Sequence, residues 1–158
     1  MKLLRNIFRR RTELLAEEIY IWLAVFLEMS KDLENDDKAK LIFMYGSLAV
    51  LLMEPVELEH GQSLSWSVFL DMISPIELNQ LTEMLNNNAK KANMTSDHMF
   101  ATALNLLSMN FRSRALSSEP IATGVDLILT PIVEHAIASV NKSQLKDTIN
   151  DLEEFLTE

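Results

Sequence analysis

The longest uninterrupted apolar segment of the chain is residues 41–53, which contain no charged side chain. A helix that is apolar on every side must be enclosed by other elements or by lipid. As a helix these residues reach only about 20 Å, short of the roughly 30 Å of a bilayer's hydrocarbon core. The next longest apolar run, residues 19–27, is shorter still. The pattern therefore predicts a buried helix over about 37–53, with the rest of the chain packed around it, and no membrane-spanning segment.

Local signals predict where the other helices begin and end. Ser74, Pro75 and Glu77 occupy the N-cap, N1 and N3 positions of a capping box, which predicts a helix from Ser74. Pro55 restricts the residue before it, so we expect the core helix to end at Glu54. The remaining periodicity predicts helices over about 12–29, 63–73, 97–116, 120 or 124 to 140, and 141–158, with residues 86–96 as a mobile connection. Further N-caps are expected at Asn35 or Asp36, and at Asn141.

Composition favours an all-α protein. The chain has 158 residues, enough for one domain with a sizeable core, and 48% of them are hydrophobic. Only three glycines and four prolines are present, whereas the turns of sheet proteins draw on both residues. Gly46 lies inside the predicted core helix, where a small residue lets another helix approach closely. We expect an all-α fold: a single irregular helical bundle of about seven helices around the central apolar helix, with residues 12–158 as one domain.

The first eleven residues are basic, with five Lys or Arg side chains and no acid. Wound as a helix, their apolar residues fall on one side and most of the basic ones on the other. A short basic amphipathic helix can lie on an anionic membrane, whereas the simpler alternative is a first helix turn docked on the core. The interleaved apolar residues argue against an arm that binds nucleic acid. The candidate membrane or anion contacts are Lys2, Leu4, Arg5, Ile7, Phe8, Arg9 and Arg10.

The last predicted helix carries a narrow apolar seam at 4-3-4 spacing, which is typical of a coiled-coil or docking stripe. Its candidate partner-binding residues are Leu145, Ile149, Leu152, Phe155 and Leu156. The alternative is that the seam packs on the chain's own core. Homodimerisation through this helix is a further prediction.

The helix before it is apolar over much of its circumference, through Val125, Ile128, Leu129, Ile132, Val133, Ala136 and Ile137. This distribution predicts a deeply buried element. Its two acids, Asp126 and Glu134, are expected to face solvent.

The sequence contains no pattern of a known catalytic site. There is no cysteine, which excludes disulfides, thiolate metal sites and a cysteine nucleophile. The three glycines are isolated, so no glycine-rich loop can hold a phosphate. Glu57 and His60 have the Glu-x-x-His spacing of di-iron bundles, but no second such motif accompanies them. Convergence of His60, His98 and His135 is left open, and we predict no catalytic residue, cofactor or metal.

Charge is distributed unevenly along the chain. The formal net charge is −9, and outside residues 1–11 the 9 basic and 23 acidic residues leave −14.

We predict a cytoplasmic, non-enzymatic helical protein that binds another protein, as an adaptor or assembly factor. The alternatives are a peripheral membrane protein anchored by residues 1–11, an acidic mimic of nucleic acid that inhibits a nucleic-acid enzyme, and a metal-dependent enzyme using Glu57, Glu59 and His60. Direct binding of nucleic acid is not expected.

Overall fold

The structure, a computed structural model, describes the backbone of residues 2–31, 36–95 and 97–157, and the side chains of residues 11–31, 36–95 and 97–154. Within these ranges the chain forms seven α-helices and no strand, which confirms the predicted all-α class. The helices are α1 (Lys2–Lys31), α2 (Asp37–His60), α3 (Trp66–Asp71), α4 (Pro75–Met94), α5 (His98–Ala115), α6 (Pro120–Ala138) and α7 (Lys142–Thr157).

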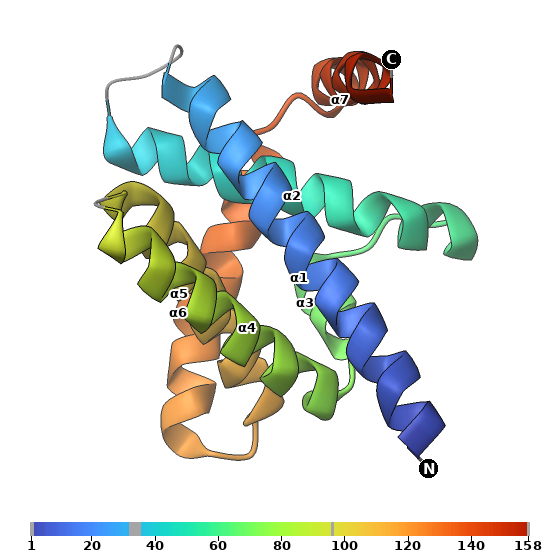
Figure 1. Cartoon of the computed structure of the whole chain (residues 1–158), viewed down its shortest axis with the longest axis vertical. Coiled ribbons are helices and arrows are strands. Elements are labelled where there is room, and N and C mark those ends of the chain that lie inside the picture. Colours follow the sequence, from blue (N-terminus) through green and yellow to red (C-terminus); the bar gives the residue numbers. More distant parts are fainter. Residues whose placement is uncertain (1, 32–35, 96, 158) are drawn as a thin grey trace.

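Five of the helices form a closed ring around the core. In the order of their contacts they are α1, α2, α6, α5 and α4, and α4 returns to α1. Figure 1 shows the long helix α1 crossing α2, with α4 and α5 packed together and α6 behind them. The short helix α3 touches α2, α5 and α6, and α7 lies at the edge of the molecule, beyond the ring.

The predicted apolar helix is a major part of the core. Every residue from Met44 to Val50 is buried, as are Leu52 and Met53. Gly46 lies where α2 meets α6: a methyl group on Gly46 would overlap the backbone carbonyl of Ala136 and stand 2.6 Å from Cγ2 of Val140. The expected close approach at Gly46 is therefore confirmed, and α6 is the helix that approaches.

The N-cap predictions are confirmed. The Ser74 hydroxyl accepts a hydrogen bond from the Glu77 amide at 3.2 Å and donates to the Glu77 carboxylate at 3.3 Å, which completes the capping box. Asp36 accepts from the Lys38 amide at the start of α2. Asn141 accepts from the Gln144 amide at the start of α7. Each cap satisfies backbone N–H groups that the helix leaves without a partner.

The predicted end of α2 at Glu54 is wrong. The helix continues through Pro55 to His60 and ends at Gly61, which adopts the left-handed conformation with φ 68°. The Gly61 and Gln62 amides both donate to the Glu57 carbonyl, so the C-terminal carbonyls are satisfied there. The missing N–H of Pro55 removes one hydrogen bond but does not stop the chain from continuing as a helix.

The predicted mobile connection over 86–96 is also wrong, because α4 continues to Met94. Ala89 and Ala92 are buried, and the Ser108 hydroxyl of α5 donates to Oδ1 of Asn86 at 2.7 Å. Packing against α5 supplies the apolar and polar partners that the local sequence lacks. Low apolar content therefore did not indicate a loop.

Residues 2–11 form the first turns of the long helix α1, which is unbroken from Lys2 to Lys31. The side chains of residues 1–10 lie outside the described residues, so all seven candidate membrane or anion contacts are untested. Arg11 is described, and it forms an ion pair with Glu77 of α4 at 3.4 Å.

Candidate protein-docking surface

α6 is unusual in this fold because it is strongly apolar and yet poorly covered. Asp126, Glu134 and His135 are its only ionisable residues. Pro120 at N1 presets the first turn, and Thr130, Val133 and Ala136 are buried against the ring. The opposite side of the helix is exposed, because among the described residues no helix packs over it.

The inner side of α6 is held by an ion pair between Asp126 and Arg114, whose side chain is only 10% exposed. Arg114 forms ion pairs with Asp126 at 3.1 Å and with Asp71 at 2.8 Å. It also donates to the carbonyl of Ser67 at 2.7 Å and to the Ser67 hydroxyl at 3.0 Å. One guanidinium thus joins α3, α5 and α6, using the several donors that its planar group provides.

A second set of polar contacts continues into the core. The Trp66 indole N–H donates to Oδ1 of Asn110 at 2.7 Å, and Nδ2 of Asn110 donates to the Thr130 hydroxyl at 3.1 Å. That hydroxyl donates to Asp126 at 2.8 Å. Each described group in this chain of hydrogen bonds has a partner, so the network fixes the orientation of α6.

The expectation that both acids of α6 face solvent is therefore wrong. Asp126 pairs with Arg114, and the Glu134 carboxylate accepts from the Ser67 amide at 3.0 Å at the start of α3. Both partners are remote in sequence, and local periodicity does not reveal them. Because its charges are turned inward, α6 presents an outer face with little charge.

The predicted deep burial of α6 is wrong for its outer face. The exposed fractions are 85% for Ile121, 64% for Ile128 and 45% for Ile132. With the half-buried Val125, these residues recur at 4-3-4 spacing and define what we call the α6 outer seam (Ile121, Val125, Ile128 and Ile132). Leu127, beside the seam, is 70% exposed. Burial is confirmed for Val133 and Ala136, while Leu129 and Ile137 are half-buried.

A groove of about 280 Å³ continues the seam toward α5. Met109, Arg112 and Leu116 line its α5 side, and Ile121 and Val125 line its α6 side. Glu119, in the turn between the helices, is also at its edge. The groove and the seam share Ile121 and Val125, so together they form one continuous, mainly apolar surface, and Arg112 and Glu119 are the charged residues that line the groove.

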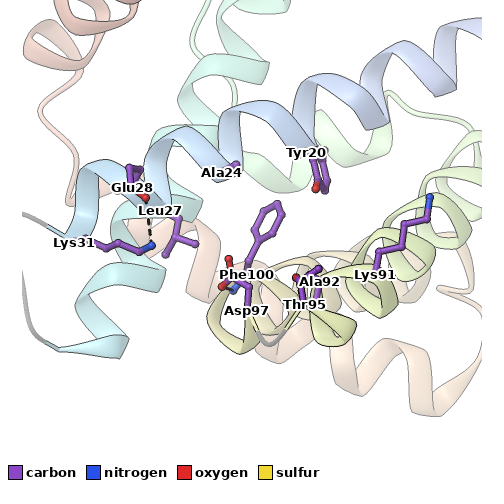
Figure 2. A pocket seen from close by; sticks show the side chains of 10 residues that line it. All are labelled: Tyr20, Ala24, Leu27, Glu28, Lys31, Lys91, Ala92, Thr95, Asp97 and Phe100. Carbon is purple, nitrogen blue, oxygen red and sulfur yellow. Dashed lines mark hydrogen bonds and ion pairs between the residues drawn. The ribbon is translucent and has the colours of Figure 1, made fainter.

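A second cavity, of about 320 Å³, lies between the ends of α1 and α4 and the start of α5 (Figure 2). Four of its polar or charged side chains bind one another or the backbone: Lys31 pairs with Glu28 at 3.2 Å, Asp97 accepts from the Phe100 amide, and Thr95 donates to the Ala92 carbonyl. Each of these contacts lies within one helix or at its end. Their arrangement does not indicate a specific ligand.

The apolar seam predicted on α7 is partly covered by the chain itself. Leu145 and Ile149 are 5% and 6% exposed, and Leu152 is half-buried. The side chains of Phe155 and Leu156 lie outside the described residues. Lys146 forms an ion pair with Glu54 of α2 at 3.3 Å. Partner binding through these five residues stays a prediction, and it requires α7 to leave its place.

The candidate metal ligands are engaged elsewhere. Glu57 accepts from the Leu64 amide at 2.8 Å, and Nδ1 of His60 bonds to the Val56 carbonyl at 2.9 Å. In the described part of the chain, no three His or acidic side chains are grouped to hold a metal ion. His60, His98 and His135 lie on different helices and are exposed.

Two helices are long and apolar enough to cross a membrane, by length and composition only. They are α2, whose most apolar window is 56% buried within the protein, and α6, whose window is 28% buried. Uninterrupted apolar runs do not reveal these two helices, because both helices extend beyond such runs. The burial of α2 is typical of the core helix of a folded domain. The low burial of α6 makes its outer face the most distinctive surface of this protein.

Comparison with known protein families, curated proteins and solved structures finds no match to the chain.

Proposed function

We propose that this protein is a non-enzymatic helical interaction protein and that it binds another protein chain through the α6 outer seam and the adjoining groove. The observation that carries the proposal is the exposure of three isoleucines at helical spacing on one uncharged face. Contiguous apolar patches of this kind are rare on monomers and typically mark interaction sites. An amphipathic helix laid into such a surface would bury the isoleucines.

Membrane association through the same face is the second candidate. It is supported by the length, apolar composition and low burial of α6. Against it, the described outer face carries no Lys or Arg of the kind that draws interfacial helices to anionic lipids. The formal net charge of −9 also disfavours approach to an anionic surface. We therefore favour a protein partner.

A photo-crosslinking amino acid at position 128 tests this proposal, with the same substitution at Ile76 as the matched control. Ile76 is 72% exposed but lies on α4. In an extract of the source cells, the full-length chain should form discrete protein adducts from position 128 and not from position 76. Excess wild-type protein should compete for the adducts, and excess Ile128→Glu protein should not.

Two results would count against a protein-docking face. One is an equal adduct pattern from positions 128 and 76. The other is flotation of the wild-type protein, but not of Ile128→Glu, with phosphatidylcholine vesicles, which would assign the face to lipid.

A further inference from the structure

We propose that a second copy of this chain covers the α6 outer seam, with the two α6 helices antiparallel about a two-fold axis. The inference rests on the proposed function, since it takes the seam to be a docking surface and names its occupant. Symmetric two-fold dimers, in which both subunits use the same surface patch, are the commonest soluble oligomers.

The spacing of the seam suits such pairing. Ile121, Val125, Ile128 and Ile132 follow a 4-3-4 spacing that is the same in both chain directions. An antiparallel partner centred between residues 126 and 127 therefore brings Ile121 opposite Ile132 of the second copy, and Val125 opposite Ile128. All four seam residues of each copy then meet apolar residues of the other, as in knobs-into-holes packing.

Charge favours the antiparallel orientation. The seam itself is uncharged, so two copies can meet there despite the net charge of −9. Glu119 precedes the helix and His135 is exposed in its last turn. A parallel pair would place Glu119 against its own copy and align the helix dipoles. An antiparallel pair separates the two Glu119 carboxylates to opposite ends of the interface, each near Glu134 and the exposed His135 of the second copy, with the dipoles opposed.

Each copy contributes one groove next to its Ile121, so the dimer has a groove at each end of the paired seams. Ile121 lies on one wall of the 280 Å³ groove, so Ile132 of the second copy would enter at its mouth. Seam and groove together offer on the order of ten residues per copy, against roughly 20–30 in a standard interface. We therefore expect a reversible dimer with a dissociation constant on the order of 10 µM.

Sedimentation equilibrium of the full chain, from about 1 to about 300 µM, provides the test. The mass should rise from 18.0 kDa toward twice that value in wild type and in the control Ile76→Glu, and stay at 18.0 kDa in Ile128→Glu. Circular dichroism confirms that each variant is folded. His135→Glu should weaken association by adding negative charge near Glu119, and the double variant His135→Glu/Glu119→Lys should restore it.

Orientation is tested with single cysteines, because the chain has none. Tagged Ile121→Cys mixed with untagged Ile132→Cys should give mainly the mixed product with a short bismaleimide. Products that join two copies of the same variant would indicate a parallel pair and overturn the proposal. A monomeric wild type at the highest concentration, or a dimer that persists in Ile128→Glu, would also overturn it. Photo-adducts from position 128 to a different protein would then leave the proposed function intact.

Discussion

Substituting alanine for each of two glycines should change stability in opposite directions. Gly46 is enclosed by α6, whereas a methyl group on Gly124 would meet no atom within 4 Å. Both residues lie inside helices, so both gain roughly 1 kcal/mol of helix propensity from Gly→Ala. Only the environments differ, which makes Gly124→Ala a matched control.

At Gly46 the added methyl group overlaps the Ala136 carbonyl, which belongs to the backbone and cannot rotate away. Overpacking of this kind costs about 1–3 kcal/mol, and obstruction by backbone favours the upper end. Subtracting the gain in helix propensity leaves the free energy of unfolding of Gly46→Ala lower than that of wild type by about 1–2 kcal/mol. Gly124→Ala should gain up to about 1 kcal/mol.

Urea unfolding followed by circular dichroism measures both free energies of unfolding. The thermal midpoint should fall by about 2–8 °C in Gly46→Ala and rise by up to about 4 °C in Gly124→Ala, from about 2–4 °C per kcal/mol at this chain length. If Gly46→Ala is as stable as wild type, α2 and α6 do not approach closely at this residue. A change of the same sign in both variants would refute the reasoning.

Three other substitutions test local contacts. Asn110→Ala removes the acceptor of the buried Trp66 indole N–H, and an unsatisfied buried group costs about 1–3 kcal/mol; unchanged urea unfolding would contradict the network. Ser74→Ala should cost about 1 kcal/mol through loss of the α4 cap, and a thermal midpoint equal to that of wild type would argue against it. Burial, and then the charge of Glu153, raise the pKa of Glu18 above 4.5. Because folding favours protonated Glu18, its contribution to stability is greatest below 4.5 and is lost as pH rises through the higher folded-state pKa. Glu18→Gln should flatten the pH dependence of unfolding in that range, and an identical profile would show that Glu18 is not perturbed.

Signals contained within a few residues predicted local structure well. Ser74, Asp36 and Asn141 cap the helices that were expected to follow them, because a cap needs only its own side chain and the next turn. The prediction that α2 ends before Pro55 was wrong, because the end of a helix also depends on residues beyond the proline. A helix can continue through a proline when a suitable C-cap follows, and here Gly61 ends α2 six residues after Pro55.

The candidate surface shows what the sequence leaves undetermined. The 4-3-4 spacing is visible in both α6 and α7, yet Leu145 of α7 is buried while Ile128 of α6 is exposed. Periodicity identifies a seam but not the element that covers it, because coverage depends on contacts remote in sequence. The spacing of the α6 residues was the available signal. Because apolar residues cover much of the circumference of α6, the composition of the helix predicts deep burial and does not distinguish the exposed seam from the buried side.

The inward charges of α6 depend on the same kind of contact. Asp126 meets Arg114 from α5, and Glu134 meets the start of α3. These pairings leave the outer face uncharged, which makes it suitable for docking. Nothing in the sequence near either acid predicts its partner.

The reactivity of a single thiol at position 128 tests the central claim most directly. In the otherwise cysteine-free chain, Ile128→Cys should react rapidly with a maleimide dye at low protein concentration, because the side chain is exposed in the folded monomer. At high concentration a second copy should protect it, while Ile76→Cys stays equally reactive at both. Slow labelling at every concentration would show that the seam is buried within the fold. Equally fast labelling at every concentration would show that no second copy covers it.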